Sequence, residues 1–178
     1  MDNATIYCLC LHNKVLPVIK KLGYVPVGLG DDKFSKEWIR DNTFENISHK
    51  NKYYSEYTFH YWFWKNILPK IEDNHWIGFS AYREHWGNKK EIYKNSKIED
   101  VVIKKIPAEW EKFDTIIGEH LYINNLKFSK LIKHGLRSLI RNPSALFKAK
   151  RNIRFHFDMW HGNGNLDKAI DQLDNKDR

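Results

Sequence analysis

Polar side chains suited to binding hydroxyls and phosphates stand beside aromatic rings in three runs between residues 41 and 86. Residues 41–51 are rich in Asn, Ser and Lys, and residues 54–66 and 76–86 hold four of the seven tryptophans. A ring face can stack on a sugar or a nucleobase, while amides and hydroxyls orient the polar atoms of such a ligand. The combination indicates a site for a sugar or a nucleotide. A core built from rings in place of aliphatic side chains is the alternative.

The elements that must position these runs alternate between strands and helices. Apolar stretches at 5–11, 24–29 and 76–79 predict buried strands, and residues 14–22 predict a connecting helix with Pro17 in its first turn. Ser48 is a credible N-cap for a helix over 49–68, although Tyr, Phe and Trp also favour strands. Because both faces of that helix are aromatic, we expect it to be buried on both sides. The pattern predicts an α/β domain with a mixed sheet flanked by helices.

The second half of the chain has a weaker pattern. Residues 101–106 and 113–118 predict two more strands, and residues 130–141 and 145–152 predict helices capped by Ser129 and Ser144. Residues 153–160 should be extended or irregular, and a last helix should follow Asn165 as its cap. The sequence contains no internal repeat and no clear linker, so we expect one domain spanning residues 1–178.

Size, hydropathy and cysteine usage narrow the class of protein. A chain of 178 residues with 42% hydrophobic side chains can form a globular domain with a core. We expect no signal peptide and no membrane span, because no stretch approaches ~20 apolar residues. Cys8 and Cys10 lie two apart in a predicted strand, so they point the same way and are poorly placed to bond each other. Buried thiols in a reducing compartment are the expectation.

The net charge of +8 is concentrated in one basic segment, residues 127–154. No Asp or Glu occurs between residues 120 and 157, where the chain carries Lys127, Lys130, Lys133, Arg137, Arg141, Lys148, Lys150, Arg151 and Arg154. Over residues 127–141 apolar side chains fill one half of the helical wheel and basic ones fill the other. This pattern predicts a helix at an anionic membrane surface. An ordinary surface helix packed on the sheet is one alternative, and a nucleic-acid-binding helix without a recognisable motif is another.

Four groups of residues follow one another in the order of a known family pattern. They are Tyr24, Pro26 and Gly30; Asp41, Asn42, Thr43, Asn46, Ile47, Ser48, Lys50 and Asn51; Tyr54, Glu56, Thr58, Tyr61, Trp62, Trp64, Lys65 and Asn66; and Ile77, Gly78, Tyr82 and Arg83. With these residues the chain resembles a bacterial capsular and exopolysaccharide-synthesis family, first catalogued as a domain of unknown function and grouped with GT-A glycosyltransferases. The resemblance is strongest over residues 5–90 and weaker to about residue 165. It implies a GT-A-like, Rossmann-like fold.

Three positions depart from that family pattern. Phe44 stands where the family usually has Gly, Ala81 replaces a usual His, and Glu84 replaces the second Arg of Tyr-Arg-Arg. Family members also run on past the end of this sequence. The resemblance therefore leaves open that the chain lacks a C-terminal part, where such an enzyme completes its acceptor side.

The resemblance implies transfer of a sugar from a nucleotide diphosphate sugar to an acceptor hydroxyl. The expected donor-binding residues, at a helix N-terminus and past the strand at 76–79, are Asn46, Ser48, Lys50, Asn51, Tyr82 and Arg83. Glu84 and His85 are the candidate general bases. Supporting roles fall to Glu56, Tyr61 and Trp64.

Each of these assignments has a plainer alternative. Arg83 could form a structural ion pair with Glu56 or Glu84. Asn46 and Ser48 could serve only to cap a helix. Glu84 and His85 could be solvated loop residues.

The expected ligands and location follow from the same resemblance. A divalent metal, Mn or Mg, could accompany the donor, but the chain has no Asp-x-Asp motif to hold it. The acceptor would be a growing glycan, in one form linked to a lipid, with the basic helix Lys130, Lys133, Arg137 and Arg141 facing an anionic membrane. We expect a cytoplasmic protein, peripheral on the inner face of the membrane, and no nucleic-acid partner. A non-catalytic carbohydrate- or membrane-binding module with a truncated glycosyltransferase fold is the alternative.

Overall fold

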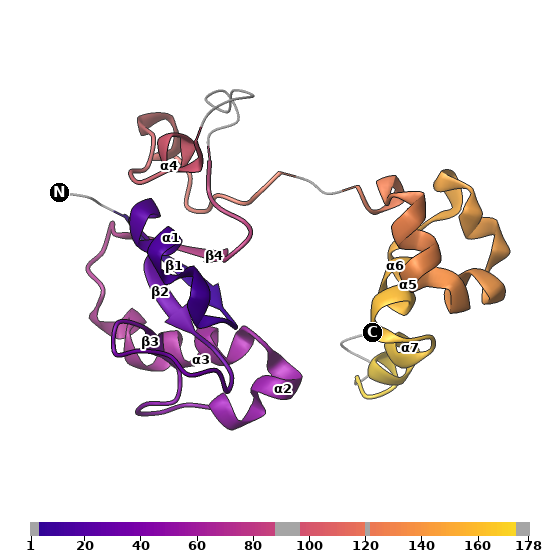
Figure 1. Cartoon of the computed structure of the whole chain (residues 1–178), viewed down its shortest axis with the longest axis horizontal. Helices are drawn as coiled ribbons and strands as arrows, with labels where there is room; N and C mark the ends of the chain where they lie inside the picture. The colour runs from indigo at the N-terminus through magenta and orange to yellow at the C-terminus, as the bar shows by residue number, and fades with distance from the viewer. Residues whose placement is uncertain (1–3, 88–96, 120–121, 174–178) are drawn as a thin grey trace. The chain divides into compact units, whose positions relative to one another are not determined.

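The computed structural model describes residues 4–87, 97–119 and 122–173. These residues form two compact units, one within residues 1–117 and the other within residues 118–178 (Figure 1). The first unit contains the sheet, and the second is helical. Each unit is described by itself.

A four-stranded parallel sheet forms the centre of the first unit. Its strands are β1 (Ala4–Cys10), β2 (Val25–Gly28), β3 (Ile39–Arg40) and β4 (Trp76–Ala81), in the order β3-β2-β1-β4 (Figure 1). The strands expected at 5–11, 24–29 and 76–79 are confirmed, and β3 was not predicted. The expectation of a mixed sheet is wrong for the described strands, whose pairings are all parallel; the one antiparallel contact is an isolated bridge between Gly87 and Val102. The connections after β1 and β3 contain helices and the one after β2 is a loop, and each returns the chain to the same edge of the sheet, so that the next strand runs parallel.

Alternate residues of β1 serve two different cores, because successive side chains of a strand point to opposite faces. Ile6, Cys8 and Cys10 pack with α1 (Leu16–Leu22) on one face. Tyr7 and Leu9 pack with α3 (Tyr57–Asn66) on the other. The sheet is thus covered by helices on both faces, which is the α/β arrangement that the sequence predicted.

The aromatic segment over 49–68 is not one helix. It consists of a 3-10 turn η2 (Ser48–Lys50), a short α2 (Asn51–Tyr54), α3, and a second 3-10 turn η3 (Leu68–Lys70). The break falls at Ser55, whose φ of 49° and ψ of −130° cannot continue a helix. Ser48 lies inside η2 and does not cap it.

Burial of this segment on both sides is also wrong. Thr58, Phe59, Trp62 and Phe63 face the sheet and are buried. Side chains on the other face are exposed to solvent, and they are Tyr53, Tyr54, Tyr57, Trp64 and Leu68. A helix packed on one face of a sheet buries one stripe only, so its second aromatic face remains on the surface.

Two of the predicted strands are absent from the first unit. The stretch 101–106 begins at the end of the short helix α4 (Ile98–Val101) and forms no strand: its ladder contact is the isolated Gly87–Val102 bridge, beside which the Ile103 N–H donates to the Trp86 carbonyl at 2.8 Å. The stretch 113–118 is irregular and follows the 3-10 turn η5 (Ala108–Trp110). Both are apolar runs of about the right length, and periodicity alone does not separate such runs from irregular segments that pack on a core.

Cys8 and Cys10 are free and buried, as expected. Their Sγ atoms are 4.0 Å apart, so the two thiols contact each other without a covalent bond. The pKa of Cys10 is raised because the Cys8 sulfur and burial both disfavour its thiolate.

The second unit packs α5 (Phe128–Arg141) against α6 (Ile153–His161), and α7 (Asn165–Ile170) follows. Helix α5 confirms the prediction for 130–141, although Lys127 and not Ser129 precedes its first turn. Residues 145–152 form no α-helix and lie in the 3-10 turns η7 (Pro143–Leu146) and η8 (Lys148–Lys150). A further 3-10 turn, η6 (Ile123–Asn125), precedes α5. The expectation of extended chain at 153–160 is wrong, because Asn152 caps α6 with its Oδ1 accepting from the Phe155 N–H at 2.9 Å.

No helix in the described parts of the chain is long and apolar enough to cross a membrane. The longest, α5, has 14 residues.

His60 makes the stability of the first unit depend on pH. Its ring centroid lies 4.5 Å from that of Phe79, and burial lowers its pKa below 6.5, with the charge of Glu56 opposing the shift. The unfolded chain then binds this proton more tightly than the folded chain. The contribution of His60 to stability is therefore complete above pH 6.5 and is lost as the pH falls through 6.5 towards the folded pKa.

We expect urea unfolding to show a free energy of unfolding that declines from about pH 7.5 to about pH 5.5. The variant His60→Gln should decline less over the same range. His49→Gln alters an exposed histidine and should decline like the unmodified chain. A decline in His60→Gln as steep as that of the unmodified chain would contradict the assignment.

Candidate functional site

The order of the strands points to one edge of the sheet. The chain builds outward from β1 through β2 to β3, and then adds β4 on the other side of β1. In open parallel sheets, ligands bind beyond the carboxyl ends of the strands at the point where the order reverses. Here that point lies between the ends of β1 and β4, at Cys10 and Ala81.

Two aromatic rings meet across this point. His12 follows β1 and Tyr82 follows β4, and their ring centroids are 6.0 Å apart at 81°. The Arg83 guanidinium carbon stands 4.8 Å from the centroid of the Tyr82 ring. Arg83 is exposed, and no ion pair among the described residues holds it, so the structural alternative with Glu56 or Glu84 is not observed. The arrangement places the exposed Arg83 and His12 beside a half-buried Tyr82 ring.

Asn51 lies on the β2 side of His12. Its Nδ2 donates to the Ser55 carbonyl at 2.9 Å and to Thr58 Oγ1 at 3.0 Å, so its donors face inward. A Cβ added at Gly30 would lie 3.5 Å from Asn51 Oδ1 and 3.8 Å from Leu11 Cδ2. Leu11 immediately precedes His12. Asn51, His12, Tyr82 and Arg83 therefore follow one another along the carboxyl ends of β2, β1 and β4, over a width of about 10 Å. We call these four residues the row.

The other residues of the predicted phosphate cradle serve the turn itself. Asn46 Oδ1 accepts from the backbone N–H and the hydroxyl of Ser48 at 3.2 and 2.9 Å, and its Nδ2 donates to the Phe44 carbonyl at 2.8 Å. Asn46 and Ser48 thus hold the turn, which is the plainer of the two alternatives. Lys50 is exposed next to Asn51 and remains available to an anion. No hydrogen bond in the described structure links this turn to Tyr82 or Arg83.

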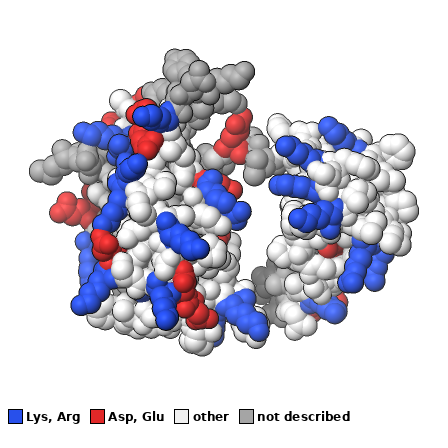
Figure 2. All heavy atoms as spheres, viewed as in Figure 1, with Lys and Arg blue, Asp and Glu red and all other residues white. Residues whose placement is uncertain are grey.

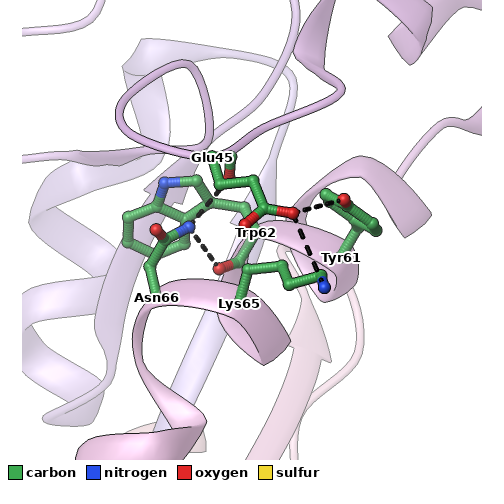
Figure 3. Close-up of polar contacts among 5 residues, drawn as sticks. All are labelled: Glu45, Tyr61, Trp62, Lys65 and Asn66. Carbon is green, nitrogen blue, oxygen red and sulfur yellow. Dashed lines mark hydrogen bonds and ion pairs between the residues drawn. The ribbon is translucent and has the colours of Figure 1, made fainter.

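Glu45 fastens the same turn to α3 (Figure 3). Its Oε1 accepts from the Tyr61 hydroxyl at 2.8 Å and lies 3.5 Å from Lys65 Nζ. Asn66 Nδ2 donates to the carbonyls of Glu45 and Trp62 at 2.9 and 2.7 Å. The hydrogen bond to Glu45 raises the pKa of Tyr61. The matched residues Tyr61, Lys65 and Asn66 therefore act by positioning the turn.

Arg40 organises the loop after β2. Its Nη2 donates to the Gly30 carbonyl at 2.6 Å, and its guanidinium carbon stands 4.6 Å from the Phe34 ring centroid. Phe34 in turn packs directly on Gly28, where an added Cβ would approach the ring to 2.6 Å. Sequence reasoning missed Arg40 because β3 has only two residues and gives no periodic signal. Its position directly before the Asp-Asn-Thr motif was the available clue.

Asp32 ties the loop after β2 to the loop after β1. Its Oδ2 accepts from the Asn13 N–H at 2.8 Å, and Asn13 Nδ2 donates to the Lys33 carbonyl at 2.7 Å. The backbone N–H groups of Asn13 and Lys33 lower the pKa of Asp32, so this exposed carboxylate is charged. The edge therefore carries both signs of charge.

Asp41 is the most unusual polar group of the edge. It follows β3, is only 1% exposed, and its Oδ2 has no hydrogen-bond partner among the described residues. A buried, unpaired carboxylate oxygen is costly and therefore rare in folded proteins. Nearby in sequence, Trp62 Nε1 donates to the Thr43 carbonyl at 2.8 Å, which fixes the chain after Asp41.

The two candidate bases differ in setting. Glu84 is exposed, and its backbone N–H donates to the Ala81 carbonyl at 3.0 Å. The ring centroid of His85 lies 6.0 Å from that of the buried Tyr24, its Nδ1 is buried with no hydrogen-bond partner among the described residues, and burial lowers its pKa. Glu84 is therefore the more accessible of the two.

The remaining supporting residues lie on the exposed side of α3. Glu56 is exposed just before the helix, and Trp64 is 53% exposed with Lys65 Nζ 4.1 Å from its ring centroid. Neither contacts the row at the carboxyl edge through a described hydrogen bond or ring contact.

A cavity of about 660 Å³ lies beside the amino-terminal ends of β1 and β4. Its lining includes Ala4, Trp76, Trp110 and Phe113, and none of the predicted donor or catalytic residues. It therefore lies at the opposite edge of the sheet from the row. Within residues 4–87, 97–119 and 122–173, no group of three or more His, Cys, Asp or Glu could hold a metal ion together.

A family model described as "Domain of unknown function (DUF4422)" matches residues 5–171. The match begins within β1 and ends just past α7, so it takes in both compact units. Neither a curated protein nor a solved structure gives a match.

Proposed function

The chain belongs to the family described as a domain of unknown function (DUF4422), and we propose that it is a glycosyltransferase of surface-polysaccharide assembly. The sugar would pass from a nucleotide-activated donor to a hydroxyl of a growing glycan. One observation carries the proposal: His12, Tyr82 and Arg83 meet between the ends of β1 and β4, where parallel sheets bind nucleotides. The resemblance of residues 22–86 to polysaccharide-synthesis proteins of GT-A type supports it.

A sugar transfer requires that the diphosphate be neutralised, that the base and sugar be held, and that the acceptor hydroxyl lose its proton. The guanidinium of Arg83 is suited to the diphosphate, since it can donate two parallel hydrogen bonds to phosphate oxygens. The rings of His12 and Tyr82 offer faces for the base or the sugar. Asn51 Oδ1 can accept from a ligand hydroxyl, and the exposed Lys50 adds positive charge beside it.

Glu84 is the proposed general base. In the transfer, the acceptor oxygen bonds to the anomeric carbon while the bond from that carbon to the diphosphate breaks. The electron pair leaves with the diphosphate, whose charge Arg83 stabilises. Glu84 takes the proton of the acceptor hydroxyl.

A divalent metal would find few protein ligands in this arrangement. Mg²⁺ and similar ions are commonly held by substrate phosphates with one or two carboxylates. Asp31 and Asp32, which are exposed after β2, could serve as these carboxylate ligands. The proposed reaction belongs to the cytoplasm, where the buried thiols Cys8 and Cys10 would stay reduced.

A non-catalytic binding module is the second candidate, and the setting of His85 favours it. With His85 packed on Tyr24, Glu84 is the only accessible one of the two predicted bases. A site with a single exposed base could bind the donor and yet not transfer its sugar.

Titration of the purified chain with UDP and GDP, with and without Mn²⁺, tests the proposal. We expect one of them to bind with a Kd between about 1 μM and 1 mM, as measured by calorimetry. Incubation with the corresponding nucleotide sugars should then release free sugar and nucleoside diphosphate. Binding of a nucleoside diphosphate, with no sugar released from any nucleotide sugar, would support the binding module instead. No binding of either diphosphate by chain with a cooperative unfolding transition would overturn both.

A further inference from the structure

Helix α5 of the second unit has three zones around its circumference. Leu131, Gly135, Ser138 and Leu139 are buried; Leu131 and Leu139 pack with Phe155 and Met159 of α6, and the Ser138 hydroxyl donates to Asn163 Oδ1 at 3.1 Å. At Gly135 an added Cβ would lie 3.1 Å from Met159 Sδ, so the small residue lets the two helices approach closely. These contacts fix which sides of α5 face solvent.

Four large apolar side chains of α5 stay outside that contact. Phe128, Ile132, Leu136 and Ile140 are 61, 42, 54 and 72% exposed, and we call them the apolar ridge. They are spaced by four residues, so they form a continuous stripe along one side of the helix. In the same unit Phe147 and Ile153 are 72 and 75% exposed. Such a contiguous apolar surface marks an interaction site.

The zone next to the apolar ridge is basic. Lys130, Lys133, Arg137 and Arg141 are exposed, and no ion pair in the described part of the unit engages them. Figure 2 shows Lys and Arg beside broad uncharged areas on this unit. Two other cations of the segment are used within the fold. Arg151 donates to backbone carbonyls, among them Ala145 at 2.9 Å, and Arg154 pairs with Asp167.

The two zones meet at an open pocket of about 590 Å³. Its lining contains Arg137 and Arg141, one helical turn apart, with His134 and the exposed Ile140, and it also includes Asp158. Guanidinium groups and an apolar side chain therefore share one hollow. A ligand that fits both has an anionic head joined to an apolar body.

We propose that the unit within residues 118–178 docks on an anionic phospholipid surface through this side of α5. The apolar ridge enters the boundary between head groups and acyl chains, and Arg137 and Arg141 contact lipid phosphates. Helix α5 is about 21 Å long, shorter than the ~30 Å hydrocarbon layer, so it lies in the plane of the membrane and does not cross it. A nucleic acid would engage the cations but leave the apolar ridge exposed, which is why lipid is favoured.

The proposal does not depend on donor binding, and vesicle co-sedimentation of the full chain tests it alone. We expect weak binding to neutral phosphatidylcholine vesicles and strong binding once phosphatidylglycerol is included, with a fall at high salt. Arg137→Gln with Arg141→Gln should weaken partitioning about 30-fold, from about fivefold per charge. Lys21→Gln with Lys36→Gln removes the same charge from the first unit and should change partitioning by less than about threefold.

Leu136→Ser with Ile140→Ser separates lipid from nucleic acid. Both side chains are exposed, so the variant should keep its helix content and its unfolding temperature, while losing about tenfold or more in vesicle binding. Equal binding to neutral and anionic vesicles would overturn the proposal. So would a Leu136→Ser, Ile140→Ser variant that binds anionic vesicles as well as the unmodified chain. Tighter binding to a DNA duplex than to vesicles, unaffected by that variant, would assign the basic zone to nucleic acid.

Discussion

Replacing Phe59 by alanine is expected to lower the free energy of unfolding of the first unit by about 3 to 5 kcal/mol. Phe59 is 0% exposed and stands in the centre of the layer between α3 and the sheet. Its ring centroid lies 5.7 Å from that of Tyr7, 5.6 Å from Trp62 and 6.3 Å from Phe79. Removing it leaves a cavity among large rings that cannot close in without shifting the helix. Because a domain is stable by only about 5 to 15 kcal/mol, this loss could abolish cooperative folding.

Urea unfolding measures the effect, with Tyr57→Ala as the matched control. Tyr57 is on the same helix and is 68% exposed, so its loss should change stability by less than about 0.5 kcal/mol. Phe59→Leu keeps most of the volume and should lie between the two. If Phe59→Ala and Tyr57→Ala were equally mild, the ring would not occupy a packed layer, and the described contact between α3 and the sheet would be wrong.

Arg83→Ala should reduce donor turnover, or diphosphate affinity, by about 100- to 1000-fold without loss of stability. A charged donor aimed at a developing phosphate charge contributes about 3 to 4 kcal/mol. Arg83 is exposed, its guanidinium carbon lies 4.8 Å from the Tyr82 ring centroid, and it has no ion pair with a described residue, so we expect the fold not to need it. Arg83→Lys retains the charge but loses the planar fork and should fall in between.

The readouts are kcat/KM for donor hydrolysis, the Kd of the diphosphate, and the unfolding midpoint. Lys21→Ala is the control, since it removes an exposed cation from the last turn of α1, away from the carboxyl edge. A stable Arg83→Ala variant that binds diphosphate like the unmodified chain would remove Arg83 from the site. A variant that loses stability by more than about 1 kcal/mol would show instead a structural role.

Strong local signals explain what the sequence predicted correctly. The strands β1, β2 and β4 are apolar runs bounded by turn residues, and α1 carries Pro17 in its first turn with Gly23 at its end in the left-handed region. Helix α5 has a regular apolar period. The position of Tyr82 and Arg83 beyond a strand end also followed from the sequence, because the apolar run at 76–79 stops just before them.

Features set by tertiary contacts were not predictable in this way. The break at Ser55 depends on a backbone conformation with positive φ, which serine adopts only when surrounding contacts impose it. Helix α6 was missed because its buried face is only Phe155 and Met159, too few to show a period. Asn46 and Ser48 are residue types that commonly bind phosphate, yet they hydrogen-bond to each other, and Asn46 also donates to the Phe44 carbonyl. His12 stands directly after the apolar run at 5–11, and its contact with Tyr82 depends on how the strands pair, which the sequence does not show.

Phe44 departs from the family pattern at a position whose backbone conformation suits glycine. Its φ is 50°, in the region where glycine is unstrained and other residues cost about 1 to 2 kcal/mol. The glycine usual at this position in the resembling family suits that conformation. The phenylalanine keeps the turn and is 84% exposed, so it gains no burial there to offset the strain.

The strand order also has a consequence for synthesis on the ribosome. The central strand β1 emerges first, but its partner β4 follows 66 residues after Cys10, at Trp76. At typical translation rates of about 5 to 20 residues per second, the nascent chain waits roughly 3 to 13 seconds before that neighbour exists. Until then one side of the apolar strand β1 has no partner strand, so we expect the chain to depend most on chaperones while residues 11–76 are being made.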